Sequence, residues 1–183
     1  MTLPARLLFA ALVPLLPAAM DSAAAQPGFT TGPLVEGFGG IAEVPGHLEV
    51  PRGTSFKVAF DVARAAEPGS VSRALDTPAR FLNMHAAAGV EPADMKLAIV
   101  IHGKAVYDVV RNTRYRDAHG TDNGSSALVA ALVEQGVVIE VCGQSAVYYG
   151  VAPDDLLPGV RMSLSAMTSH ALLQQDGYTL NPF

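Results

Sequence analysis

The chain has 183 residues, of which 50% are hydrophobic and 16% are charged, and its formal net charge is −5. This length suggests one domain with a sizeable core. An acidic chain without a basic cluster is not expected to bind nucleic acid. The single cysteine cannot form a disulfide within the chain, so stability must come from the core, with or without subunit contacts.

The first 25 residues have the three parts of a secretory signal peptide. Met1 to Arg6 is a short basic start, Leu7 to Ala19 is apolar, and Ala23 to Ala25 supplies the small residues of a cleavage site. The apolar run is too short and too rich in proline to be a good membrane span. We therefore expect an exported, soluble protein, periplasmic if the source is bacterial, with no membrane contact after cleavage.

The next segment, residues 26–54, is rich in glycine and proline and carries scattered apolar side chains. This composition predicts an extended N-terminal arm that lies across a surface, and not an independent domain. An α/β domain is expected to occupy residues 55–183.

Strand patterns alternate with helix patterns through that domain. Strands are expected at 56–62, 97–101, 137–142 and 160–164, with a short fifth strand at 177–180. Helices are expected from Thr77-Pro78 to Gly89, from Ser125 or Ser126 to Gly136, and from Ser165 onward, with brief helical stretches at 105–110 and 153–156 and a polar loop over 112–124. The last helix is expected to bury Ala166, Ala171, Leu172 and Leu173. The alternation implies a three-layer α/β/α fold with a mostly parallel sheet of about five strands.

The strongest chemical signal lies in residues 137–147. A β-branched strand ends at Cys142, Gly143 allows a change of direction, and Gln144-Ser145 can cap a new helical segment. Open α/β sheets bind ligands at the carboxyl ends of their strands, and a helix N-terminus favours a thiolate over a thiol. Cys142 is therefore a candidate nucleophile. The alternative is a buried cysteine that only fills space.

Further polar side chains follow the other strands at the same expected edge. His102 is a candidate base for Cys142, although a histidine after a strand can equally have a structural role. Asp61 also falls at a strand end. The candidates for holding an anionic sulfur or oxygen are Gly143, Gln144, Ser145 and Ser165.

The remaining histidines and motifs point away from a metal or a cofactor. His85 is expected to pack or to contact another subunit, His119 to be exposed, and His170 to be structural. Close Cys and His spacing is absent, so no metal site is expected. The sequence has no G-x-G-x-x-G after the first strand and no P-loop motif, so no cofactor is expected. It also has no G-x-C-x-G elbow, which argues against a nucleophile of the α/β-hydrolase type.

Four sequence stretches carry a resemblance to a known family. They are residues 79–89 (ARFLNMHAAAG), 100–103 (VIHG), 141–145 (VCGQS), and 165–168 (SAMT) followed by Gly177-Tyr178. From about Phe56 to Phe183 the chain resembles the DsrE/DsrF-like family. The resemblance implies a three-layer fold, a homo-oligomer (trimer or hexamer), and a persulfide carried on Cys142 and passed between a sulfur donor and an acceptor protein.

Three functional hypotheses follow for the single thiol. In the first, the protein handles sulfur, with Cys142 as nucleophile and persulfide carrier and a persulfide anion stabilised by the features that lower a thiol pKa. In the second, it is an oligomeric module that binds a small ligand, and the cysteine is inert. In the third, the cysteine is a redox sensor resolved by a thiol of another protein.

Overall fold

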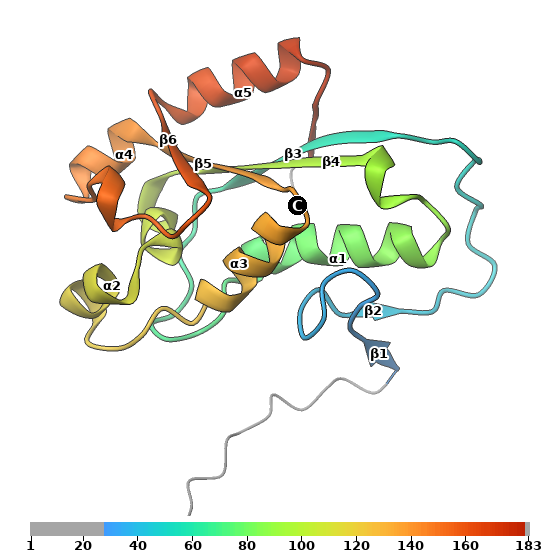
Figure 1. Cartoon of the computed structure of the whole chain (residues 1–183), viewed down its shortest axis with the longest axis horizontal. Coiled ribbons are helices and arrows are strands. Elements are labelled where there is room, and N and C mark those ends of the chain that lie inside the picture. Colours follow the sequence, from blue (N-terminus) through green and yellow to red (C-terminus); the bar gives the residue numbers. More distant parts are fainter. Residues whose placement is uncertain (1–27, 182–183) are drawn as a thin grey trace, which may run out of the picture.

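The computed structural model describes residues 28–181, so the predicted signal peptide lies outside the described residues. Five parallel strands form one sheet in the order β6-β5-β4-β3-β7. The strands are β3 (Phe56–Val62), β4 (Met95–Ile101), β5 (Val138–Cys142), β6 (Val160–Ser163) and β7 (Thr179–Asn181). Helix α5 (Ala166–Gln175) covers one face, and α1 (Arg73–Ala87) and α3 (Ser126–Glu134) cover the other (Figure 1). The predicted α/β fold with five parallel strands between helices is confirmed.

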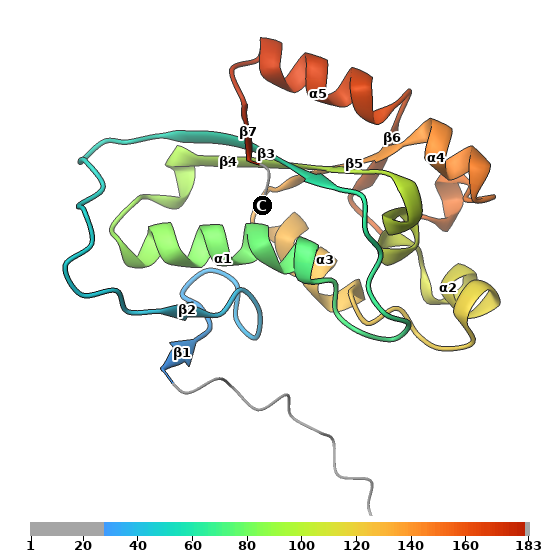
Figure 2. The same ribbon diagram turned by 180° about the vertical axis from the view of Figure 1, so that it is seen from behind.

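Strand β4 is the centre of the sheet. All of its residues except Lys96 are buried, as expected for a parallel strand covered on both faces. It pairs with β3 on one side and with β5 on the other, and β7 is the edge strand next to β3 (Figure 2). Because all five strands are parallel, their carboxyl ends lie along one edge, next to α4 (Gly143–Tyr148).

Helix α1 begins at Arg73, earlier than the expected start at Thr77-Pro78. Leu75 and Ala79 are both fully buried in the core, so the burial of Leu75 favours helix on the N-terminal side of the proline. Pro78 then lies inside the helix, where it removes one backbone hydrogen bond. The expected proline-led start was therefore wrong because packing outweighed the local signal.

The region from 103 to 124 also differs from expectation. The expected polar loop contains α2 (Asn112–His119), which ends at Gly120 in a left-handed conformation. Tyr115 is its one buried residue, so the helix shows little apolar periodicity along the sequence. The helical stretch before it is a 3₁₀ segment, η2 (Gly103–Val109); two shorter 3₁₀ segments are η1 (Pro92–Asp94) and η3 (Pro153–Asp155).

Helix α5 packs less deeply than the sequence pattern predicts. Ser169 is its one buried residue, whereas Leu172 is 60% exposed and Met167 is 80% exposed. Ala171 is exposed as well, and Ala166 and Leu173 are half-buried. The expected burial of this apolar set was therefore wrong within the described chain, because the helix rests on the sheet through a small side chain and turns its larger apolar groups outward.

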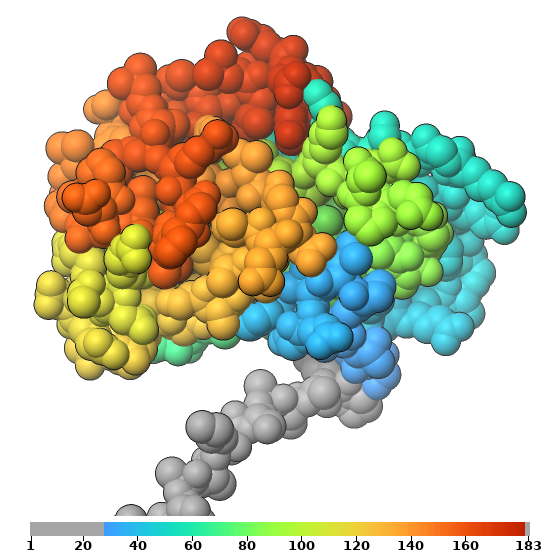
Figure 3. All heavy atoms as spheres, viewed as in Figure 1, coloured from blue at the N-terminus to red at the C-terminus, as the bar shows by residue number. Residues whose placement is uncertain are grey.

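The arm that precedes β3 is folded onto α1. It contains a short antiparallel pair, β1 (Phe29–Thr30) and β2 (Ile41–Ala42), and Figure 3 shows this segment, in blue, seated against the body of the domain. Asn83 of α1 is fully buried; its carbonyl oxygen accepts the N–H groups of Leu34 and Val35. Its amide group donates to the carbonyl oxygens of Val35, Phe38 and Gly39. One side chain thus satisfies several backbone groups of the arm.

Candidate functional site

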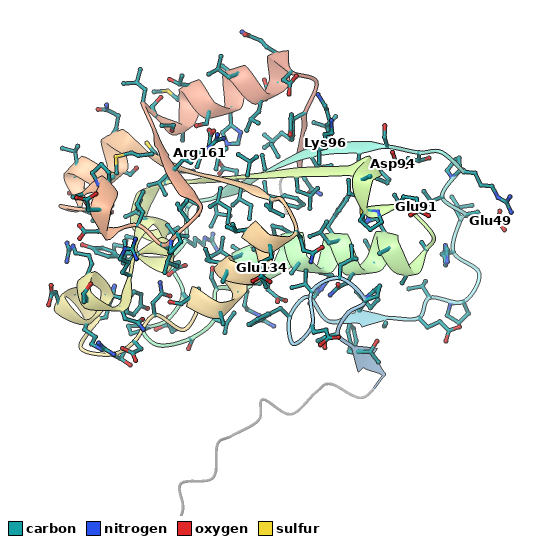
Figure 4. All side chains as sticks on the ribbon, viewed as in Figure 1. Glu49, Glu91, Asp94, Lys96, Glu134 and Arg161 are labelled. Atoms are coloured by element: carbon teal, nitrogen blue, oxygen red, sulfur yellow. The ribbon has the colours of Figure 1, made fainter. Side chains whose placement is uncertain are left out.

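The carboxyl edge of the sheet collects side chains from neighbouring strands. Asp61 is near the end of β3, His102 directly follows β4, and Cys142 is the last residue of β5. The opposite edge, where β4 begins, carries Asp94 and Lys96, which Figure 4 shows far from α4. The predicted convergence at one edge therefore has its physical cause in the parallel register.

A surface pocket of about 430 Å³ opens at this edge. Its lining residues are Asp61, His102, Cys142, Gln144, Ser145, Ser165, Ala166, Met167 and His170. Larger hollows of about 690 and 670 Å³ lie along the arm and the end of α1, and neither contains the cysteine. Chemistry, and not size, therefore makes the smaller pocket the candidate site.

Cys142 occupies the junction between β5 and α4. It is the residue that precedes the first turn of α4, and 5% of it is exposed, so the thiol is sheltered but belongs to the pocket wall. Burial raises the pKa of this thiol. Hydrogen bonds from the Ser145 hydroxyl and from the backbone N–H groups of Ser145, Ala166 and Gln144 outweigh burial, so the net pKa lies below its ordinary value. The site therefore favours the thiolate.

The residues predicted to hold an anion play different parts. Ser145 contributes both hydroxyl and N–H to Cys142, and Gln144 contributes its N–H while its side chain points to the Leu164 carbonyl oxygen at 3.4 Å. The hydroxyl of Ser165 caps α5 by accepting the Thr168 N–H at 3.0 Å, so its contribution is to start the helix whose first N–H reaches the thiol.

Gly143 is not part of the pocket wall, and its role is steric. A Cβ atom added there would lie 2.6 Å from the carbonyl oxygen of Ser163, so only glycine lets α4 start this close to the end of β6. The close approach keeps the starts of α4 and α5 next to each other, and both donate backbone N–H groups to Cys142.

His102 is turned toward a carboxylate. Its Nε2 lies 3.1 Å from Oδ2 of Asp61, and no hydrogen bond joins it to Cys142 within residues 28–181. His170 lies on the other side of the same carboxylate, with Nε2 2.7 Å from Oδ1. Burial raises the pKa of Asp61, but hydrogen bonds and charge from the two histidines outweigh this effect and lower it overall.

His170 lies in the wall of the pocket, a position that the sequence interpretation did not predict. It was expected to be structural because it lies inside the last helix, yet it lines the pocket and bonds Asp61. A signal was present: α5 begins at the carboxyl edge, so side chains in its first two turns stay close to that edge. Met167 and Ala166 line the pocket for the same reason.

The other two histidines pack against aromatic rings. His85 stacks on Phe81 with ring centroids 3.9 Å apart, in agreement with its expected packing role. His119 lies against Tyr107 and Tyr115, with centroids 5.0 and 4.6 Å away, and it is half-buried where exposure was expected. Neither belongs to the pocket at the carboxyl edge.

The described part of the chain lacks the signatures of a metal site and of a membrane span. Residues 28–181 contain no group of three His, Cys, Asp or Glu side chains placed to hold a metal ion. Within that range no helix combines the length and the apolar character needed to cross a bilayer.

Comparison with known proteins agrees with this architecture. The sequence pattern of the DsrE/DsrF-like family matches residues 57–182. A protein of unknown function, MTH1491 from Methanobacterium thermoautotrophicum, is similar in structure with a TM-score of 0.53 and 22% identity, over 70% of this chain and 100% of that chain. The ychN protein from E. coli has a TM-score of 0.51 and 17% identity, over 70% of this chain and 99% of that chain.

At these identities the two solved structures support the fold alone. Among curated proteins, no sequence matches this chain. The family pattern covers most of the chain, including all of the five-stranded sheet except Phe56 and all the residues that line the pocket at its carboxyl edge. The chain belongs to the DsrE/DsrF-like family, which is associated with sulfur transfer.

Proposed function

We propose that the protein carries sulfur as a persulfide on Cys142. The observation that supports this most directly is the set of donors around the thiol, one hydroxyl and three backbone N–H groups, which lowers its pKa despite burial. A thiolate is the form of cysteine that attacks sulfur, so these donors favour the reactive state. The terminal sulfur of a persulfide is also anionic near neutral pH and benefits from the same kind of environment.

The pocket is suited to keep that sulfur from water while leaving one approach open. Cys142 is almost covered, and Met167 and Ala166 add apolar surface beside it. A persulfide exposed to solvent reacts readily with other thiols, so shelter favours a carrier over an open reactive cysteine. Family membership supports sulfur transfer in general, and the hydrogen-bond donors around the thiol support Cys142 as the residue that carries the sulfur.

Intact-protein mass spectrometry tests this proposal. The purified protein, incubated with inorganic polysulfide and then freed of small molecules, should gain the mass of one sulfur atom. The gain should be reversed by a reducing thiol and absent from Cys142→Ser. Because the chain has one cysteine, no other thiol competes for the label. Failure of the unaltered protein to gain sulfur would contradict the proposal.

The proposal includes export. The N-terminal pattern of residues 1–25 supports cleavage after Ala25 and a periplasmic location in a bacterial source. Mass spectrometry of the protein recovered from fractionated cells should find a mature chain that starts at Gln26. An uncut chain in the cytoplasmic fraction would overturn this part.

The proposal also includes a homo-oligomer of three or six copies. The outward side of α5 supports it, because Met167 and Leu172 are large apolar residues left exposed beside the pocket. Leu164, just before α5, and Val147 and Tyr148 in α4 are exposed in the same way. A second copy packed there would cover this surface and border the Cys142 pocket, through which the sulfur donor and acceptor proteins would reach the thiol.

A further inference from the structure

Asp61 joins two histidines that come from distant parts of the chain. It is the only carboxylate in the wall of the pocket at the carboxyl edge. Its Oδ2 faces His102, in the turn after β4, and its Oδ1 faces His170, in α5. Each carboxylate oxygen therefore accepts one N–H group, and the two contacts fix the orientation of the carboxylate plane.

The two imidazole rings differ in whether their second nitrogen can reach a group bound in the pocket. With Nε2–H directed to Asp61, each ring has its Nδ1 left for other contacts. Nδ1 of His170 is buried without a partner, so a proton placed there would be a buried donor with no acceptor. Nδ1 of His102 also lacks a partner within the described chain, but the His102 side chain is 33% exposed and lines the pocket. Of the two rings, His102 is the one placed to exchange a proton with a bound group.

We propose that Asp61 and His170 are positioning residues that hold His102, and that His102 Nδ1 donates a proton to the group that leaves when sulfur reaches Cys142. The inference rests on the proposed function and adds a proton donor to it. Asp61 fixes the orientation of the His102 ring, in the way that a third group orients the histidine in other nucleophilic sites. His170 acts on the carboxylate and not on the substrate.

The chemical step balances with a low-molecular-weight persulfide, R–S–SH, as donor. The Cys142 thiolate attacks the outer sulfur, a new S–S bond forms at Cys142, and the old S–S bond breaks with its electron pair on R–S⁻. The proton on His102 Nδ1 passes to R–S⁻ and gives R–SH. One neutral sulfur atom moves, so no external oxidant or reductant is needed. The need for the proton grows with the basicity of the leaving thiolate.

Leaving-group basicity therefore tests the proposal. Rates with glutathione persulfide, whose leaving thiolate is strongly basic, are compared with rates with 4,4′-dithiodipyridine, whose leaving group is weakly basic. Asp61→Asn and His170→Ala should slow the first reaction at least tenfold relative to the second, because proton-transfer catalysis contributes about 10²–10⁴-fold and the loss of a positioning residue removes part of that contribution. For each reagent, the rate of the variant is divided by the rate of the unaltered protein. A change in the fraction of Cys142 present as thiolate affects both ratios equally, so it cancels when the two are compared.

Two further variants sharpen the result. His170→Gln keeps an N–H donor for Asp61 and should restore most of the rate with glutathione persulfide. Asp117→Asn makes the same chemical change on the exposed side of α2 and should leave both rates unchanged. Equal slowing with both reagents, or no slowing, would overturn the positioning role. Absence of a persulfide on the unaltered protein with glutathione persulfide would instead overturn the proposed function, and the proton-donor role with it.

Discussion

Ser145 connects the ends of two neighbouring strands through one hydroxyl group. Its Oγ accepts the backbone N–H of Gly103, just after β4, at 3.0 Å, and its hydroxyl hydrogen is donated to Cys142 at the end of β5. The N–H of Gly103 thus orients the hydroxyl so that its hydrogen points to sulfur. This is a cooperative pair of hydrogen bonds in a sheltered site, where each bond strengthens the other.

Replacing Ser145 by alanine should raise the Cys142 pKa. The hydrogen bond from this hydroxyl has the largest effect of those that oppose burial and lower the Cys142 pKa, and alanine leaves the burial in place. The pH at which the rate of alkylation by iodoacetamide reaches half its maximum should move upward by about one unit, which corresponds to about 1.4 kcal/mol of lost thiolate stabilisation. The sign follows from the loss of a donor to the anion, which leaves the thiol form favoured up to higher pH.

Ser126→Ala is the matched control. The Ser126 hydroxyl is also enclosed, but it has no hydrogen-bond partner among residues 28–181 and lies in α3, outside the pocket. Its removal should leave the alkylation midpoint in place. A midpoint that does not move in Ser145→Ala would show that the three backbone N–H groups determine the pKa without the hydroxyl.

At this scale the sequence identified the candidate cysteine more readily than the residues that surround it in the structure. Cys142, followed by a glycine and a serine, is a local pattern, and local patterns can be read along the chain. The pairing of Asp61 with His170 joins residues 109 positions apart and depends on where α5 crosses the sheet. No spacing rule covers such a contact, so His170 was assigned a structural role.

The junction of β5 and α4 depends on the absence of a side chain at Gly143. Gly143 does not have a left-handed backbone, so the requirement for glycine is contact with the neighbouring strand and not conformation. The carbonyl oxygens of Ser163 and Leu164 occupy the space of a Cβ atom, at 2.6 and 3.2 Å. Backbone atoms of a paired strand cannot rotate away as a flexible side chain can.

Gly143→Ala should therefore destabilise the fold and open the site. Overpacking of this kind costs about 1–3 kcal/mol, and relief requires α4 to move away from β6. The thiol should then lose N–H donors, so its alkylation midpoint should rise together with a fall in the midpoint of thermal unfolding. Gly40→Ala is the control, since its added Cβ would meet only ordinary contacts at 3.9 Å. Unchanged stability and alkylation in Gly143→Ala would contradict the steric role.

The arm is the element for which composition was least informative. Glycine and proline predict an extended segment, but they do not show where it binds. The anchor is on α1, where Asn83 is fully buried although it lies on a helix that otherwise buries apolar residues. A buried asparagine with both ends of its amide bonded to another segment specifies one docking position.

Asn83→Ala should release the arm while the sheet stays folded. The buried backbone groups around residues 34–39 would lose their hydrogen-bond partners, which costs about 1–3 kcal/mol of folding free energy. If the arm leaves α1, water can bind these groups and recover part of that free energy. Limited proteolysis should then cut between residues 30 and 54 much faster than in the unaltered protein. Asn83→Asp, which keeps the acceptor for the Val35 N–H, should give an intermediate rate. The Cys142 alkylation rate should stay constant, because the arm lies on the other face of the sheet from α5 (Figure 1).

For the molecule as a whole, the alternation of strands and helices was sufficient to predict the layers and the parallel sheet. It was not sufficient to predict which apolar residues are core. Leu172 and Ala171 were expected to be buried because they are apolar and helical, and a sequence pattern cannot distinguish burial in the same chain from burial against another. Because they are exposed in the single chain, they give the expected oligomer a candidate contact surface that mutation can test.

Placing a charge on the exposed side of α5 should break the assembly without unfolding the chain. Leu172 is 60% exposed in the single chain, so Leu172→Glu costs little within one copy but buries an unpaired carboxylate if a second copy covers α5. Light scattering coupled to size exclusion should find three or six copies for the unaltered protein and a monomer for the variant, with the same far-ultraviolet circular dichroism. Leu48→Glu is the matched control, because Leu48 is 94% exposed in the arm and away from α5. An unaltered protein that is monomeric, or a Leu172→Glu variant of unchanged size, would contradict an interface between copies on α5.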